Sequence, residues 1–143
     1  MRKVVVFFIL IIIVIFIVAF MYFNYKTGKE KIDEKNYEFE SYLGKEIYGT
    51  EVATLINKAS YKNRKNNVEQ EKNGKYIDNG KDSINIDIKM LDNDKTYNME
   101  KFYNNGTMEF VEYYRDIKFK VMNIEYHKET GLVKYIFIEQ ITK

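Results

Sequence analysis

The hydrophobic and polar positions of this chain follow three successive patterns, and the first is an unbroken apolar run. Residues 4–23 contain no charged side chain. An α-helix of that length is about 30 Å long, which matches the hydrocarbon core of a bilayer. The pattern predicts a basic head and membrane-spanning anchor over residues 1–23.

A cleaved signal, a lipoprotein signal and a core helix each fit the apolar run less well than an anchor does. A cleaved signal peptide has a shorter apolar region and a small-x-small exit, whereas Ala19 has Ile17 two positions before it. A lipoprotein signal needs a Cys, and the chain has none. A buried core helix would show a polar face. We therefore expect an uncleaved anchor.

The basic residues around the run bear on its orientation. Arg2 and Lys3 precede it, which favours a cytoplasmic N-terminus, but a larger set follows it and argues the other way. That set is Lys26, Lys29, Lys31 and Lys35. Because a short basic head before a long apolar run is typical of a signal anchor, we expect the C-terminal domain to be extracytoplasmic.

Residues 24–36 are polar and predict a juxtamembrane stalk, and residues 37–143 predict a single domain.

The second pattern, within that domain, is the stripe of an amphipathic helix. Its apolar side chains follow the spacing i, i+3, i+4, i+7, which predicts a helix. They are Val52, Leu55, Ile56 and Ala59.

Two glycines before this helix are similar in spacing to a phosphate-binding loop. Gly44 and Gly49 stand five apart, but Thr50 occupies the position of the required Lys, and Glu51 occupies that of the magnesium-binding hydroxyl. We interpret Gly44 as the residue just past a helix end, Gly49 as a turn and Thr50 as an N-cap. The segment is therefore expected to be a helix break.

The third pattern is strict alternation, in residues 83–90, which predicts a half-buried strand. Residues 92–94 (Asp-Asn-Asp) predict a turn, and a return strand is expected from Thr96. A short helical turn over 99–105 should end at Gly106.

The C-terminal quarter predicts a hairpin, whereas residues 107–116 fit helix and strand equally well. In 117–126 the apolar set changes face, which predicts a bulge near Val121. Gly131 suits the left-handed position of the hairpin connection. Residues 132–141 are apolar on both faces, as in a central strand.

Together these elements predict an α+β fold: the N-terminal transmembrane helix, one or two further helices and an antiparallel sheet of about four strands.

Residues 62–82 are polar and Asn-rich, with Val68, Tyr76 and Ile77 as their apolar side chains. We expect them to form a long surface connection.

Charge and cysteine content narrow the function classes. The 23 Lys and Arg exceed the 21 Asp and Glu by two, and Arg2 and Lys3 account for the excess. The remainder is balanced, which gives no electrostatic reason to expect nucleic-acid binding. Without Cys there are no disulfides or thiolate ligands.

The residues do not assemble a recognisable catalytic or metal site. His127 is the one histidine, and we expect it to be exposed at the hairpin end. None of the three serines, Ser41, Ser60 and Ser83, lies in the sequence context of a nucleophile elbow. The acids near aromatic residues, Glu109, Glu112 and Glu125, are expected at the surface. Asp92-Asn93-Asp94 resembles half a calcium loop but lacks the glycine and the distal glutamate. We expect no catalytic residue, cofactor or metal.

Aromatic content is the most unusual feature, with 13 Tyr, 10 Phe and no Trp. Tyr113, Tyr114 and Arg115 follow one another, and Tyr and Arg are enriched at protein interfaces. They are our candidate partner contact. The alternative is that the tyrosines simply cover the sheet.

The segment Tyr42-x-Gly44-x4-Gly49-Thr50-x-Val52-x2-Leu55-Ile56 resembles one in small, uncharacterised, signal-anchored proteins of low-GC bacteria. That resemblance implies an envelope location and no known activity. The layout is also similar to type IV pilins and pseudopilins, but residues 1–23 contain neither the Gly nor the Glu of their processing site.

These observations predict a single-pass membrane protein whose extracytoplasmic domain is non-catalytic and binds or assembles with another envelope protein. A pilin-like filament or secretion-system subunit is the first alternative. A hydrolase of envelope polymers is the second, and it would need converging carboxylates, or His127 paired with one.

Overall fold

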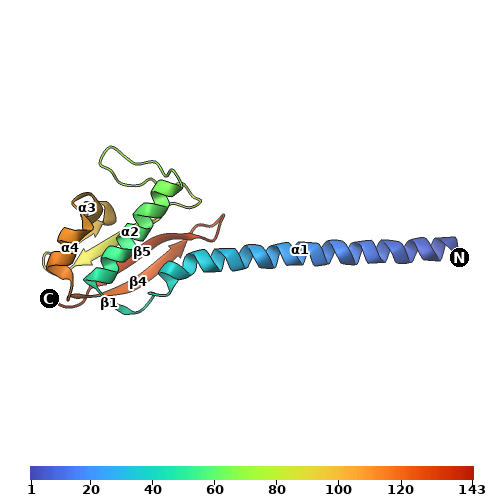
Figure 1. The fold of residues 1–143 in the computed structure, drawn as a ribbon, viewed down its shortest axis with the longest axis horizontal. Coiled ribbons are helices and arrows are strands. Elements are labelled where there is room, and N and C mark those ends of the chain that lie inside the picture. The colour runs from blue at the N-terminus through green and yellow to red at the C-terminus, as the bar shows by residue number, and fades with distance from the viewer. The chain divides into compact units, whose positions relative to one another are not determined.

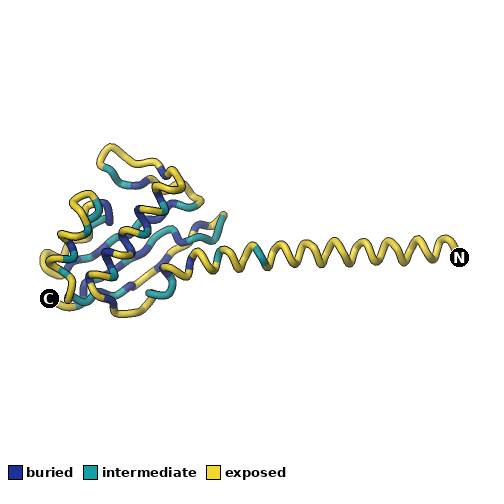
Figure 2. Tube along the Cα trace, in the orientation of Figure 1, coloured by how far each residue is buried: buried dark blue, intermediate teal, exposed yellow.

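The computed structural model describes residues 1–143. The chain forms two compact units, residues 1–35 and residues 36–143. Helix α1 (Arg2–Glu40) makes up the first unit and contributes its last residues to the second (Figure 1). Its apolar part is long and hydrophobic enough to cross a membrane, although a signal sequence would meet the same criterion. Its side chains are exposed along that part (Figure 2).

The second unit is built on a five-stranded sheet with strand order β1-β4-β5-β2-β3. The strands are β1 (Glu46–Tyr48), β2 (Asn85–Met90), β3 (Lys95–Asn98), β4 (Lys118–Tyr126) and β5 (Val133–Gln140). The α+β class is confirmed. The sheet has one strand more than expected, and β2 and β5 pair in parallel, so it is only mostly antiparallel.

Three helices cover one face of this sheet (Figure 1). They are α2 (Gly49–Lys65), α3 (Met99–Asn104) and α4 (Thr107–Tyr114). Residues 107–114, whose pattern left helix and strand open, therefore form a helix. The apolar stripe of α2 is fully buried in the same core cluster as alternate residues of β2 and β5, which confirms the helix and strand predictions. This gives a two-layer core.

The C-terminal hairpin has the predicted irregularity and position. The β4–β5 register shifts between Val121 and Asn123, which confirms the bulge. Strand β5 lies between β4 and β2 at the centre of the sheet, as its two apolar faces indicated. Gly131 has a φ of +69° in the connection, the left-handed conformation that glycine adopts without strain.

The face of the sheet away from the helices carries a row of alternating charges. Residues in register across β1, β4, β5 and β2 are Glu46, Lys120, Glu139 and Lys89. The Lys89 Nζ lies 3.9 Å from the Glu139 Oε1. Opposite charges directly across neighbouring strands stabilise their pairing modestly.

The glycines of the helix break have different physical roles. Gly44 has a φ of +73° and lies in a turn, and its N–H donates to the Val121 carbonyl. Gly49 is already the first residue of α2, where a Cβ would lie 2.0 Å from the Tyr114 carbonyl oxygen. Its role is therefore close packing against the end of α4 and not the predicted turn.

The assignment of Thr50 as the N-cap was wrong by two positions. Tyr48 precedes the first helical residue, and its backbone N–H donates to the Glu51 carboxylate at 2.9 Å. Thr50 lies inside the first turn. The negative charge of Glu51 at a helix N-terminus is favourable, as the sequence indicated.

The polar connection starts later than predicted, because α2 continues to Lys65. Val68 and Tyr76 are buried, whereas Ile77 is exposed. The side-chain amide of Asn79 organises the chain after it, since its Oδ1 accepts hydrogen bonds from the N–H groups of residues 81–83. The buried side chains of Val68 and Tyr76 therefore anchor the connection to the core.

The close approach at Gly49 makes a testable prediction. Substitution Gly49→Ala should lower the free energy of unfolding by about 2 kcal/mol or more, because the new methyl group must displace the backbone at Tyr114. Urea unfolding of the full chain in detergent, followed by near-ultraviolet circular dichroism, measures this. Gly28→Ala is the control, since a Cβ there meets nothing within 4 Å. Equal stability of the two variants would contradict the packing role.

Candidate binding pocket

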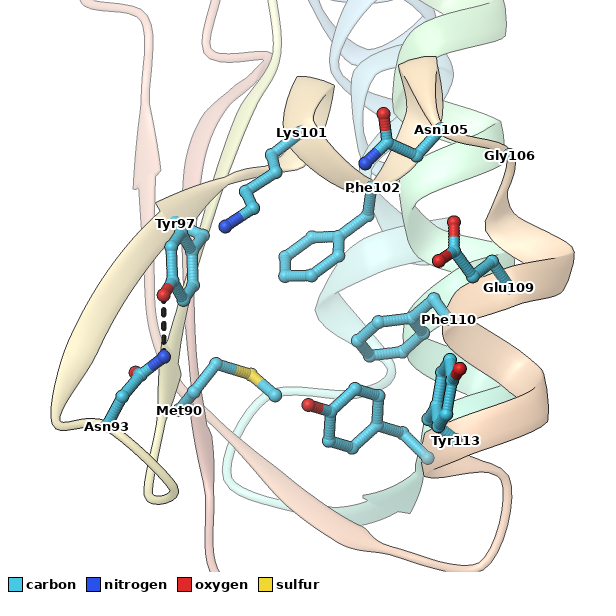
Figure 3. A pocket seen from close by; sticks show the side chains of 11 residues that line it. Met90, Asn93, Tyr97, Lys101, Phe102, Asn105, Gly106, Glu109, Phe110 and Tyr113 are labelled. Carbon is cyan, nitrogen blue, oxygen red and sulfur yellow. Dashed lines mark hydrogen bonds between the residues drawn. The ribbon is translucent and has the colours of Figure 1, made fainter.

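One pocket of about 230 Å³ lies between the end of β2, β3 and the helices α3 and α4 (Figure 3). All of its lining residues belong to the second unit. They are Met90, Asn93, Tyr97, Lys101, Phe102, Asn105, Gly106, Glu109, Phe110, Tyr113 and Tyr114.

Five of the eleven lining residues are aromatic, and some of their rings link the pocket to the core. Phe102 and Phe110 meet edge to face with centroids 4.9 Å apart, and Phe110 lies 4.9 Å from Tyr114. Phe110 also contacts Phe119 of β4. Each such aromatic pair contributes about 0.5–1.5 kcal/mol beyond its buried area. The wall is therefore part of the folded core.

Several of the polar groups that line the pocket already have partners. The Asn93 side-chain amide donates to the Tyr97 hydroxyl at 2.6 Å. Burial, and then the nearby Asp92 carboxylate that hydrogen-bonds it, raise the pKa of the Tyr114 hydroxyl. The Lys101 Nζ lies 3.6 Å from the centroid of the Tyr97 ring, in a cation–π contact.

Local sequence explains how two short helices enclose the pocket. The Asn98 side chain caps α3 by accepting the Lys101 N–H at 3.3 Å. Gly106 then adopts a φ of +89°, which ends α3 near its predicted limit and starts α4 immediately. Tyr113 lies on the same side of α4 as Glu109 and Phe110 because it follows them by four and three residues. Figure 3 shows them lining the same side of the pocket.

The structure brings two of the three predicted contact residues to this pocket. Tyr113 and Tyr114 line it, and Tyr113 is 72% exposed. Arg115 does not line it. It faces a separate open depression with Tyr48, Thr50 and Asp116.

His127 is not exposed, contrary to the sequence prediction. It is only 3% exposed, and its Nε2 lies 2.8 Å from the Ser83 carbonyl oxygen. Because a carbonyl can only accept, that ring nitrogen carries a hydrogen and donates it. Residues 78–83 cover the hairpin end, which sequence periodicity could not show.

A carboxylate does lie beside this histidine, but it is engaged elsewhere. The Asp78 Oδ1 is 3.7 Å from the His127 Nδ1, and its Oδ2 lies 2.8 Å from the Lys134 Nζ. The hydrogen bond from Lys134 lowers the pKa of Asp78, helped by the Gly80 N–H. Because the imidazole is enclosed, the contacts of Asp78 with His127 and Lys134 serve to hold residues 78–83 against the hairpin.

The other candidate residues are dispersed. The Ser83 hydroxyl donates to Asp78 and not to the imidazole, whereas Ser60 is buried and Ser41 partly so. Glu109, Glu112 and Glu125 are exposed, and of these only Glu109 lines the pocket. Residues 92–94 form the expected turn, and no group of three or more His, Cys, Asp or Glu is placed to hold a metal.

Comparison with known proteins adds no name to this site: no family model, curated protein or solved structure matches the chain. The pocket is therefore interpreted from its own geometry.

Sequence reasoning missed most of the wall. The pattern assigned Met90, Tyr97 and Phe102 only to a strand face, a return strand and a helical turn. The one signal that pointed here was the concentration of aromatic residues between positions 97 and 114. Their convergence depends on the β2–β3 turn and on Gly106, which place separate segments around one space.

The Asp78–Lys134 pair makes a pH-dependent prediction. Since the pKa of Asp78 is lower in the folded protein, the pair stabilises the fold above the ordinary carboxyl pKa, and this stabilisation is lost as the pH falls through the folded-state value. We expect the stability difference between wild type and Asp78→Asn to shrink between about pH 5 and pH 2. Urea unfolding at each pH measures it. A difference that stays constant would show that the pair does not stabilise the fold.

Proposed function

We propose that this chain is a single-pass membrane protein whose 36–143 unit is a non-catalytic, extracytoplasmic binding domain for another protein of the cell envelope. The observation that carries the proposal is the aromatic pocket, which has an exposed tyrosine at its edge. Tethering both proteins to one membrane would raise the effective concentration of each toward the other.

The anchor is supported by α1. Its apolar part exposes its side chains on all sides, which suits lipid and is unfavourable in water. Basic residues precede it, as in a signal anchor. The domain bounds also agree with this arrangement, because the compact second unit begins only at Asn36.

The binding role is supported by the contrast between the two neighbouring tyrosines of α4. The Tyr114 ring packs on Phe110 and Phe119 and belongs to the core. Tyr113 stands 72% exposed beside the same pocket. An exposed tyrosine beside a preformed pocket with aromatic walls resembles the composition of an interface hot spot, where Tyr is enriched.

The hydrolase alternative receives less support from the geometry. Glu109 is the one carboxylate among the pocket-lining residues, and no histidine is among them. The histidine–carboxylate pair that would suit catalysis is His127 with Asp78, and the imidazole is enclosed. We therefore propose no catalytic role for the pocket.

Photocrosslinking in intact cells tests the binding role. With p-benzoylphenylalanine in place of Tyr113, we expect a discrete adduct with one envelope protein. The same residue in place of Tyr61, an exposed tyrosine of α2 that does not line the pocket, should give none. Glu109→Trp should remove the adduct by filling the pocket, whereas Glu112→Trp on the same helix should not. Equal adducts from both positions would contradict the proposal.

A single Cys tests the orientation. Since the chain has no Cys, Asn66→Cys in the exposed start of the connection gives one reactive site. We expect a membrane-impermeant maleimide to label it in intact cells. Labelling only after lysis would place the domain in the cytoplasm.

A further inference from the structure

We infer that the pocket takes one neutral aromatic side chain of the partner, held between the rings of the wall and the ammonium group of Lys101. This inference rests on the proposed function, because it names the group through which the partner would bind. It follows from the size, the charge and the hydrogen bonding of the pocket.

Size limits the occupant to one ring-sized group. Pockets that hold drug-sized ligands have volumes of about 300–1,000 Å³, and this one has about 230 Å³. A single large side chain fits such a space, whereas a strand or helix of a partner would lie across its edge. The exposed ring of Tyr113 is available there to contact the partner's backbone.

Charge disfavours ionised occupants of either sign. The lining holds one cation, Lys101, and one carboxylate, Glu109, so the pocket has no net charge. An ion of either sign is attracted by one of them and repelled by the other, and it gains no net attraction to offset the cost of its desolvation. A neutral group meets neither penalty.

The hydrogen bonding favours an apolar ring over a sugar. A sugar presents hydroxyl groups that need partners in the pocket. The Tyr97 hydroxyl already accepts from Asn93, and the Asp92 carboxylate lies beside the Tyr114 hydroxyl. The polar groups left for a sugar are those of Asn105, Glu109 and Tyr113, whereas the most buried lining residues are Met90 and Phe110.

An aromatic ring gains contacts that an aliphatic group does not. It can meet the edge of Phe102, which is partly exposed, and lie against the small exposed part of Met90. It can also offer a second face to the Lys101 ammonium, which lies at the pocket beside Tyr97 (Figure 3). These contacts select an aromatic side chain among neutral ones.

The test uses the full chain in lipid nanodiscs with ¹³C-labelled methionine methyl groups. Met90 lines the pocket, and Met108, exposed on the same helix as Tyr113, is the internal control. N-acetyl-tyrosinamide and N-acetyl-tryptophanamide should shift the Met90 methyl signal saturably and leave Met108 unchanged. Their affinity should exceed that of N-acetyl-leucinamide by about tenfold. N-acetyl-argininamide and methyl glucoside should not saturate.

Two pairs of variants separate the pocket from general effects. Glu109→Trp should abolish the shift, and Glu112→Trp should keep it. Lys101→Gln should weaken aromatic binding about threefold, whereas Lys95→Gln, an exposed lysine of β3 outside the pocket, should not. Circular dichroism of each variant checks that the domain is folded.

The outcomes distinguish this inference from the proposed function. Saturable binding of methyl glucoside, equal binding of leucinamide, or no shift of Met90 with any probe would overturn the inference. A Tyr113 crosslink together with any of those results would leave a protein-binding domain that uses another anchor. Aromatic selectivity without a crosslink would support the pocket chemistry and overturn the envelope-protein proposal.

Discussion

The packing of the helical layer depends on the point where α2 meets the end of α4. At Gly49 the two backbones are so close that no side chain fits between them, and the Gly49 N–H donates to the Ile117 carbonyl just beyond α4. This contact fixes the C-terminal end of α4. Phe110 and Tyr114, towards that end of α4, pack on Phe119 of β4 and form part of the pocket wall.

Elements with a long, unambiguous pattern could be predicted from the sequence. The all-apolar run, the stripe of α2, the alternation in β2 and the face change at Val121 each report on burial that repeats over several residues. Local chemistry was equally informative at Gly106 and Gly131, where a left-handed backbone selects glycine. In these segments local preference and tertiary structure agree.

Features that depend on distant segments could not be predicted. Strand β1 has three residues, too few to show a period, and the parallel pairing of β2 with β5 is set by the chain between them. His127 looked exposed because its covering segment lies more than forty residues earlier. The same limit applied to the pocket: two of its eleven lining residues were named as contacts, because a surface built from several short segments leaves no repeat in any of them.

The charge row on the open face of the sheet bears on how copies of this chain behave when crowded together. Stacking two sheets face to face would remove water from the four alternating charges of each copy, and desolvating an ion costs several kcal/mol. Within one sheet Lys89 pairs with Glu139, and Glu46 pairs with the neighbouring Lys118. Against a second copy each charge would need an opposite charge directly facing it. The row therefore disfavours self-association through that face.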